Sequence, residues 1–135
     1  MFIDFSTING TTVGRPFERE LKVILSPDTN RSINDFTFIL STLAPNGGCT
    51  DFHVHDTSGE LMIFMSGSGK AWFEGMEYKI KPGTALYAPP GSEHKTMNTG
   101  NEPLMIACIF IPAIASEYIV KSAEEANNAK EASNE

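Results

Sequence analysis

Short segments of alternating or continuous hydrophobic residues follow one another along the chain, and stretches rich in glycine and proline separate them. Segments with the β-branched and aromatic residues typical of strands are ELKVIL (20–25), FTFILSTL (36–43), ELMIFM (60–65), KAWFE (70–74), MEYKI (76–80), TALYA (84–88), HKTMN (94–98) and LMIACIFI (104–111). The last is nearly continuous in apolar residues and is predicted to be buried on both faces. Many short strands, about 8–12 residues apart, predict an all-β sandwich or barrel.

The two ends of the chain follow different patterns. MFIDFSTI (1–8) is apolar and strand-like, whereas SEYIVKSAEEANNAKEA predicts one amphipathic helix with Ser116 as its N-cap. Tyr118, Ile119 and Val120 are expected to pack this helix against the barrel. The last residues, about ten in number and rich in Ala, Asn and Glu, are expected to be frayed or disordered.

These patterns predict an N-terminal strand or arm over 1–19, a β-barrel over 20–114, and a C-terminal helix with an acidic tail over 115–135. A chain of 135 residues can bury a hydrophobic core without disulfides. Cys49 and Cys108 are too few for a disulfide framework, and we expect them to be free thiols.

Charge and hydropathy narrow the range of partners. The net charge of −7 argues against nucleic acid and against an anionic membrane surface. No segment has the roughly 20 apolar residues that a membrane-spanning helix needs. The N-terminus lacks the basic region and long apolar run of a signal peptide, so we expect a cytoplasmic protein.

The chain has three histidines, and two of them lie on alternate positions of FHVH. If this segment is extended, His53 and His55 project from the same side. Glu60 follows a DTSG turn, and His94 is the third histidine. Neutral imidazole is the commonest protein ligand of metals. An HxH pair alone is weak evidence, however, because histidines also lie on barrel surfaces or form hydrogen bonds in cores.

Two spaced patterns give the pair more weight. In the first, five residues separate Gly47 from His53, one separates His53 from His55, four separate His55 from Glu60, and six separate Glu60 from Gly67. In the second, Gly83, Pro89, Gly91, His94 and Asn98 are separated by five, one, two and three residues.

These patterns resemble the two motifs of the cupin superfamily, G(X)5HXH(X)3–4E(X)6G and G(X)5PXG(X)2H(X)3N. The resemblance implies a cupin double-stranded β-helix, or jelly-roll, barrel. It also implies that His53, His55, Glu60 and His94 bind one divalent metal, which can be Mn, Fe, Ni, Zn, Co or Cu. One departure is Thr84, at a turn position where many cupins have Asp.

The resemblance implies several possible reactions. Four protein ligands leave two positions of an octahedral metal open to a small oxygen-rich molecule, such as a hydroxy, keto or dicarboxylic acid or a sugar derivative. We expect a metal-dependent enzyme with lyase, isomerase, decarboxylase or dioxygenase chemistry. Since every histidine belongs to the ligand set, the pattern slightly favours chemistry in which the metal polarises the substrate or activates water. A non-catalytic protein that binds or senses a metal-anchored ligand is the alternative, and a structural metal barrel is the least favoured reading.

Other features stay open from the sequence alone. Met62, Phe64, Trp72 and Tyr87 are candidates for the cavity wall but fit a plain core equally well. Arg15, Arg19 and Arg31 could anchor a substrate carboxylate, although solvated or ion-paired arginines are the simpler interpretation. SGSGK (66–70) lacks the spacing of a phosphate loop, and the two cysteines lack the spacing of a zinc finger. The apolar N-terminus and the resemblance together predict a homodimer, in which N-terminal strands can be exchanged.

Overall fold

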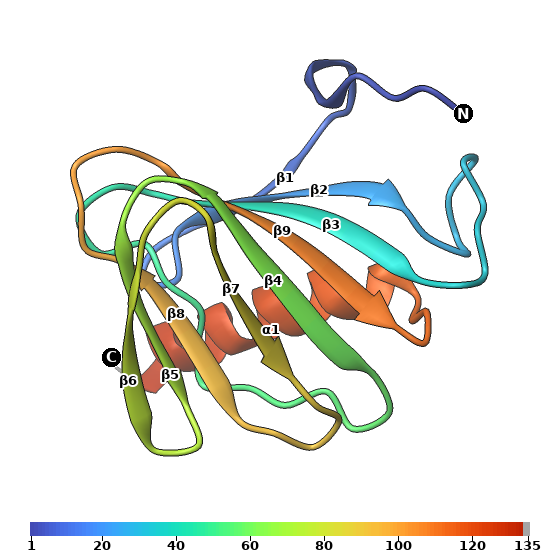
Figure 1. The fold of residues 1–135 in the computed structure, drawn as a ribbon. Coiled ribbons are helices and arrows are strands. Elements are labelled where there is room, and N and C mark those ends of the chain that lie inside the picture. The colour runs from blue at the N-terminus through green and yellow to red at the C-terminus, as the bar shows by residue number, and fades with distance from the viewer. Residues whose placement is uncertain (134–135) are drawn as a thin grey trace.

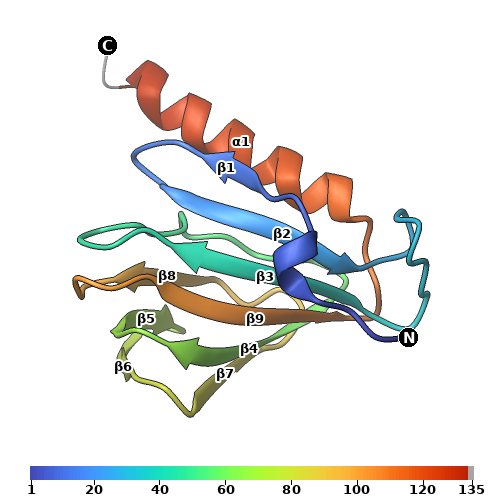
Figure 2. The ribbon, with the colours of Figure 1, turned by 90° about the horizontal axis from the view of Figure 1, so that it is seen from above.

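Nine strands in two antiparallel sheets, with one long helix beside them, make up residues 1–133, the part of the chain that this computed structural model describes (Figures 1 and 2). In chain order the elements are the 3-10 helix η1 (Phe5–Thr7), β1 (Thr11–Val13), β2 (Arg19–Leu25), β3 (Thr37–Leu43), β4 (Gly59–Ser66), β5 (Gly69–Phe73), β6 (Met76–Ile80), β7 (Thr84–Ala88), β8 (His94–Asn98), β9 (Leu104–Ile111) and α1 (Ser116–Ser133).

The larger sheet has the strand order β1-β2-β3-β9-β4-β7, and the smaller has the order β6-β5-β8. β9 pairs with β3 on one side and with β4 on the other, so this strand joins the two halves of the larger sheet. This arrangement confirms the all-β, jelly-roll prediction. From β2 to β9 the strands begin and end close to the predicted limits because glycine and proline interrupt the chain at each turn.

The strand that the hydrophobic pattern predicts at the N-terminus does not form. Residues 1–8 form no strand; η1 occupies Phe5–Thr7, and the first strand is Thr11–Val13. Asp4 caps η1, since its Oδ1 accepts hydrogen bonds from the backbone N and the Oγ of Ser6, both within 2.9 Å. Such local side-chain bonds compete with strand pairing.

The inner faces of the two sheets form the hydrophobic core. In β9, Leu104, Ile106 and Phe110 are buried there. The opposite face of this strand is only partly covered, and Ile111 is 52% exposed. The prediction that this strand is buried on both faces is therefore wrong for its C-terminal end.

α1 runs alongside β1 (Figure 2). It continues to Ser133, well into the segment expected to be disordered; 134 and 135 lie outside the described residues. Burial explains the extra length: Asn127 is buried, and its Oδ1 accepts a hydrogen bond of 3.2 Å from the backbone N of Phe17. Ile119 and Val120 pack against the core as expected, whereas Tyr118 is mostly exposed.

A carboxylate from the β2–β3 loop caps the N-terminus of α1. Asp28 accepts hydrogen bonds from the backbone N and Oγ of Ser116 and from the backbone N of Glu117, at 2.9–3.1 Å. Ser26 Oγ donates a further bond of 2.6 Å. Desolvation raises the pKa of Asp28, but these hydrogen bonds outweigh it and hold the pKa well below its usual value.

Within residues 1–133, no helix has both the length and the hydrophobicity that a membrane-spanning helix requires.

Replacing Asp28 by Ala should remove this cap and destabilise the protein by about 1 kcal/mol near neutral pH. A carboxyl whose pKa is lowered by folding stabilises the protein above its unfolded pKa and loses that effect as the pH falls through its folded pKa. In urea unfolding, the difference in unfolding free energy between wild type and Asp28→Ala should therefore be present at about pH 7 and become smaller below about pH 4. Asp35→Ala, which removes an exposed carboxylate from the same loop, is the control. A difference in unfolding free energy that does not change with pH would contradict the role of the Asp28 charge.

Candidate metal centre

The segment that carries His53 and His55 is held against β8 by backbone hydrogen bonds. His53 N donates to His94 O at 3.1 Å, and His94 N donates to His53 O at 3.0 Å. Gly91 N donates to His55 O at 2.9 Å, and Gly91 has the left-handed φ of 80° that favours glycine. FHVH is thus not the expected strand but an irregular segment with a single bridge at His53. These bonds nevertheless bring three histidines together from two distant parts of the sequence.

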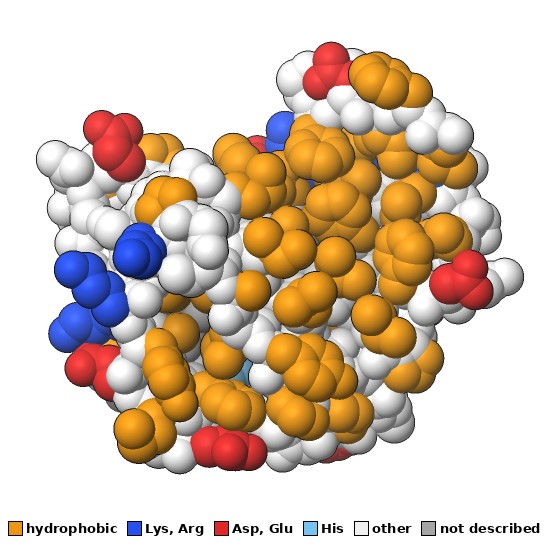
Figure 3. Space-filling model, viewed as in Figure 1, with side chains coloured by type: hydrophobic (Ala, Val, Ile, Leu, Met, Phe, Trp, Pro, Cys, Tyr) orange, Lys and Arg blue, Asp and Glu red, His pale blue; other side chains and the backbone are white. Residues whose placement is uncertain are grey.

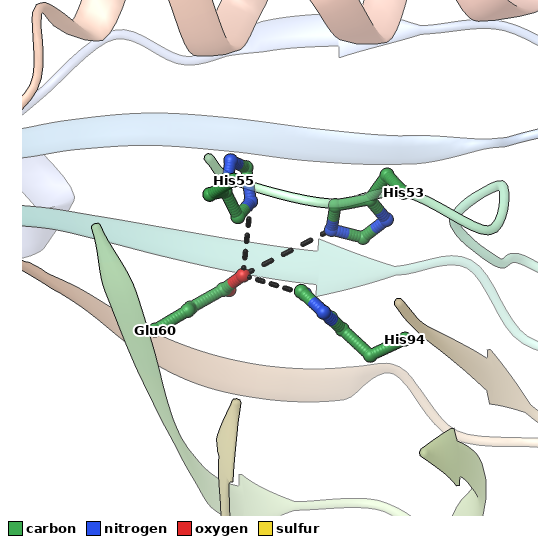
Figure 4. A group of neighbouring side chains, drawn as sticks. All are labelled: His53, His55, Glu60 and His94. Atoms are coloured by element: carbon green, nitrogen blue, oxygen red, sulfur yellow. Dashed lines mark hydrogen bonds and ion pairs between the residues drawn. The ribbon is translucent and has the colours of Figure 1, made fainter. Parts of the chain in front are cut away.

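The three imidazole rings converge on one carboxylate oxygen, as Figure 4 shows. Oε1 of Glu60 lies 2.9 Å from Nε2 of His94, 3.2 Å from Nε2 of His55 and 3.9 Å from Nε2 of His53. One potential ligand atom from each residue lies within 4.8 Å of all the others. The four residues predicted as ligands therefore form a candidate site for one metal ion.

Backbone carbonyls orient two of the imidazoles. Nδ1–H of His53 donates to the carbonyl oxygen of Asp51 at 2.8 Å, and Nδ1–H of His94 donates to that of Ser92 at 3.0 Å. A neutral ring that donates from Nδ1 has its lone pair on Nε2, which here faces the cluster. Hydrogen bonds of this kind fix the ring orientation of metal-binding histidines.

The cluster lies inside the barrel, where Glu60 is 5% and His94 1% exposed. Desolvation opposes ionisation of Glu60, but the three neighbouring imidazoles of His53, His55 and His94 outweigh it and hold the carboxyl pKa well below its usual value. Desolvation also opposes protonation of His94, but the contact with Glu60 outweighs it and raises the pKa of this imidazole. The carboxylate is therefore ionised and available to a cation.

The unpartnered ring of His55 supports the fit of a metal ion. Both of its ring nitrogens are buried, and neither has a hydrogen-bond partner of good geometry among the described residues. Such buried atoms are rare unless an ion or water satisfies them. Three imidazole nitrogens and one carboxylate oxygen also suit the later first-row divalent metals.

The cluster opens onto a cavity of about 170 Å³. Met62, one of the predicted wall residues, lines it, whereas Phe64 lies in the core and Tyr87 is 53% exposed. Trp72 borders a separate surface hollow. The helix α1 supplies part of the cavity wall through Tyr118, Ile119, Ser122, Ala123 and Ala126, a contribution that the sequence pattern did not predict.

Both cysteines are free, as predicted, and both are buried. Cys108 lines the cavity beside Glu60, and burial raises the pKa of its thiol well above the usual value. The thiol is therefore protonated. Cys49 donates to the carbonyl oxygen of Pro16 at 3.7 Å.

The three arginines have different surroundings. Arg15 is exposed and pairs with Glu18 at 3.5 Å, and Arg31 donates to backbone carbonyls of β2. Arg19 is the first residue of β2 and lines the cavity. The strand predicted from the hydrophobic pattern, 20–25, begins one residue after Arg19. The alternation of Arg19 with Leu21, a core residue, was the signal that could have placed it on the inner face.

The family model for the Cupin_2 domain matches residues 39–110. The chain belongs to the cupin family. An uncharacterized protein of Methanocaldococcus jannaschii is 29% identical over 97 residues, which are 72% of this chain and 76% of that protein. A glucose-6-phosphate isomerase of Pyrococcus horikoshii is 31% identical over 72 residues, which are 50% of this chain but only 38% of the isomerase.

Among solved structures, a predicted oxalate decarboxylase of Thermotoga maritima has a TM-score of 0.74 and 25% identity, over 83% of this chain and 99% of that chain. KdgF from Halomonas sp. also has a TM-score of 0.74, over 87% of this chain and 97% of that chain, but its identity of 16% shows the fold alone.

Protein purified without added metal should contain about one divalent ion per chain by elemental analysis. His94→Ala and His55→Ala should lose it, because each removes one nitrogen from a set of four ligand atoms. Glu93→Gln is the matched control, since this exposed neighbour of His94 lies outside the cluster. Absence of metal from the wild-type protein, even after reconstitution with Mn²⁺, Fe²⁺ and Zn²⁺, would contradict the site.

Proposed function

We propose that this cupin is a mononuclear metal enzyme that acts on a small oxygen-rich metabolite by lyase, isomerase or decarboxylase chemistry. The convergence of three Nε2 atoms and one carboxylate oxygen at a cavity carries the proposal. A bound divalent ion would supply Lewis-acid polarisation of a substrate oxygen. The distant relationship to glucose-6-phosphate isomerases and the similarity to a predicted oxalate decarboxylase support redox-neutral chemistry of this kind.

The protein's own residues would position the substrate and exclude water. Leu21, Ile39 and Met62 supply apolar wall, and α1 covers one side. Since all three histidines belong to the cluster, a proton transfer at the substrate must use another group. Beyond the cluster, the ionisable residues of the described cavity wall are Arg19, Asp51, Cys108 and Tyr118.

Metal-loaded protein, incubated with hydroxy, keto and dicarboxylic acids and with phosphorylated sugars, should convert at least one of these substrates, as followed by proton NMR. Glu60→Gln should lower turnover at least about 100-fold, because mutation even of outer-shell metal contacts costs 10- to 100-fold. Glu93→Gln should retain activity. Tight binding of a panel member without turnover would instead favour the alternative, a non-catalytic protein that binds a metal-anchored ligand. Consumption of O₂ by the iron-loaded protein would indicate dioxygenase chemistry.

We also propose that the protein is a homodimer that pairs the outer faces of its larger sheets. Figure 3 shows a broad hydrophobic surface over β3, β9 and β4 with few charged residues inside it. Its exposed members include Ile63, Met65, Tyr87 and Ile111, which are 38–53% exposed. An exposed apolar surface of this extent is typical of interaction sites. A face-to-face pair would also cover the outer side of β9.

Ile63→Lys should convert the dimer to a monomer, since an isologous interface would bring two lysines into the same apolar contact. Light scattering coupled to size-exclusion chromatography measures the mass. Met76→Lys places the same charge on the exposed strand β6 of the other sheet and should leave the dimer intact. A wild-type monomer over the accessible concentration range would overturn the proposal.

A further inference from the structure

Arg19 places a guanidinium in the wall of the metal cavity. It begins β2 and alternates with Leu21, so both side chains lie on the inner face of the larger sheet. Among the described residues that line the cavity, Arg19 is the only lysine or arginine. The cavity of this acidic protein thus contains one fixed positive charge in addition to its metal ligands.

The hydrogen bonds of Arg19 leave one edge of the guanidinium open. Nη1 donates to the carbonyl oxygens of Phe17 at 2.9 Å and Cys49 at 3.3 Å. Within residues 1–133, Nε and Nη2 have no hydrogen-bond partner, and no carboxylate lies within ion-pair distance. Nε and Nη2 together form the edge that binds a carboxylate through two parallel hydrogen bonds.

Arg31 provides an internal comparison. Its Nε donates to Ile24 O at 2.8 Å, its Nη2 to Val23 O at 3.1 Å, and its Nη1 to Asn30 Oδ1 at 3.2 Å. All three nitrogens of Arg31 are thus engaged within the protein, as expected of a structural arginine. Arg19 is anchored by one nitrogen only, and within residues 1–133 its remaining donors have no hydrogen-bond partner.

The charges around the cavity favour an anion. Arg19 and Glu60 line the same cavity, so the guanidinium shares this space with the metal cluster. A divalent ion would more than neutralise Glu60, and Arg19 would then be an additional positive charge in a partly dry cavity. Arginine stays charged even when buried. Asp51 is the other carboxylate of the wall; it is exposed, and its Oδ1 already accepts a hydrogen bond from Phe52 N.

We propose that Arg19 is the anion-binding residue of this cavity and selects a small carboxylate as substrate. The carboxylate would pair with Nε and Nη2 of Arg19, while a second oxygen group of the same molecule, a hydroxyl, keto or carboxyl group, would bind at the metal cluster. This inference rests on the proposed function. The volume of about 170 Å³ favours small acids, since pockets for larger ligands begin at roughly 300 Å³. Neutral sugars would leave the cation unpaired.

The test uses the full chain loaded with Mn²⁺, with malonate, oxalate and pyruvate as probes and malonamide as the uncharged equivalent of malonate. Mn²⁺ affinity is measured first, by electron paramagnetic resonance of the free ion, and probe affinity follows by calorimetry. Arg19→Met should bind Mn²⁺ within about threefold of wild type. It should bind the preferred carboxylate about 10- to 100-fold more weakly, the loss expected for a hydrogen-bonded charge. Arg19→Lys should bind the carboxylate with intermediate affinity, because lysine retains the positive charge but lacks the two parallel N–H donors of the guanidinium.

Arg31→Met is the matched control and should leave both affinities unchanged. Wild-type protein should also prefer malonate to malonamide, a comparison that needs no variant and holds even if Arg19→Met fails to fold. Equal binding of these two probes, unchanged carboxylate affinity in a folded Arg19→Met, or no carboxylate binding to the loaded wild-type protein would overturn the inference. Failure of the proposed function has a different signature, namely loss of Mn²⁺ binding by the wild-type protein itself.

Discussion

The ionised carboxylate of Glu60 in the barrel interior is the constraint on which the site depends. A buried charge is costly unless other groups compensate for it. Here the compensation comes from three imidazoles, the nearest of which, His94, is itself almost fully buried. The backbone hydrogen bonds between His53 and His94 hold the two histidine segments together. This pairing of distant segments places the imidazoles beside the Glu60 carboxylate, whose charge they compensate.

The cavity wall draws on more of the chain than the metal cluster does. All four cluster residues lie within 39–110, the region that the cupin model matches. Arg19 and the residues of α1 lie outside it, before and after the family domain. The family region thus provides the candidate metal centre and much of the cavity wall, and the flanking segments complete that wall.

Helix α1 can form part of that wall because tertiary contacts hold it at both ends. Asp28 caps its first turn from the β2–β3 loop, and Asn127 bonds to the backbone of Phe17 in its second half. Neither partner is close in sequence, so local composition gave no sign of what holds the second half of the helix in place. The N-terminus shows the opposite case, since Asp4 and Ser6 form a local hydrogen-bonded turn where the hydrophobic pattern alone indicated a strand.

The sequence by itself determined the strands from β2 to β9 and the candidate ligand set. Turn residues and alternation act over a few neighbouring positions, and the spacing of His53, His55, Glu60 and His94 is a property of the chain itself. Only the tertiary structure decided that Arg19 lines the cavity and Arg31 does not, that α1 forms part of the wall, and that the outer side of β9 is only partly covered. These outcomes depend on which segments pack together across long sequence separations. Arg19 lines the cavity and reaches the backbone of Cys49, 30 residues away, whereas Arg31 bonds to the backbone of the adjacent strand β2.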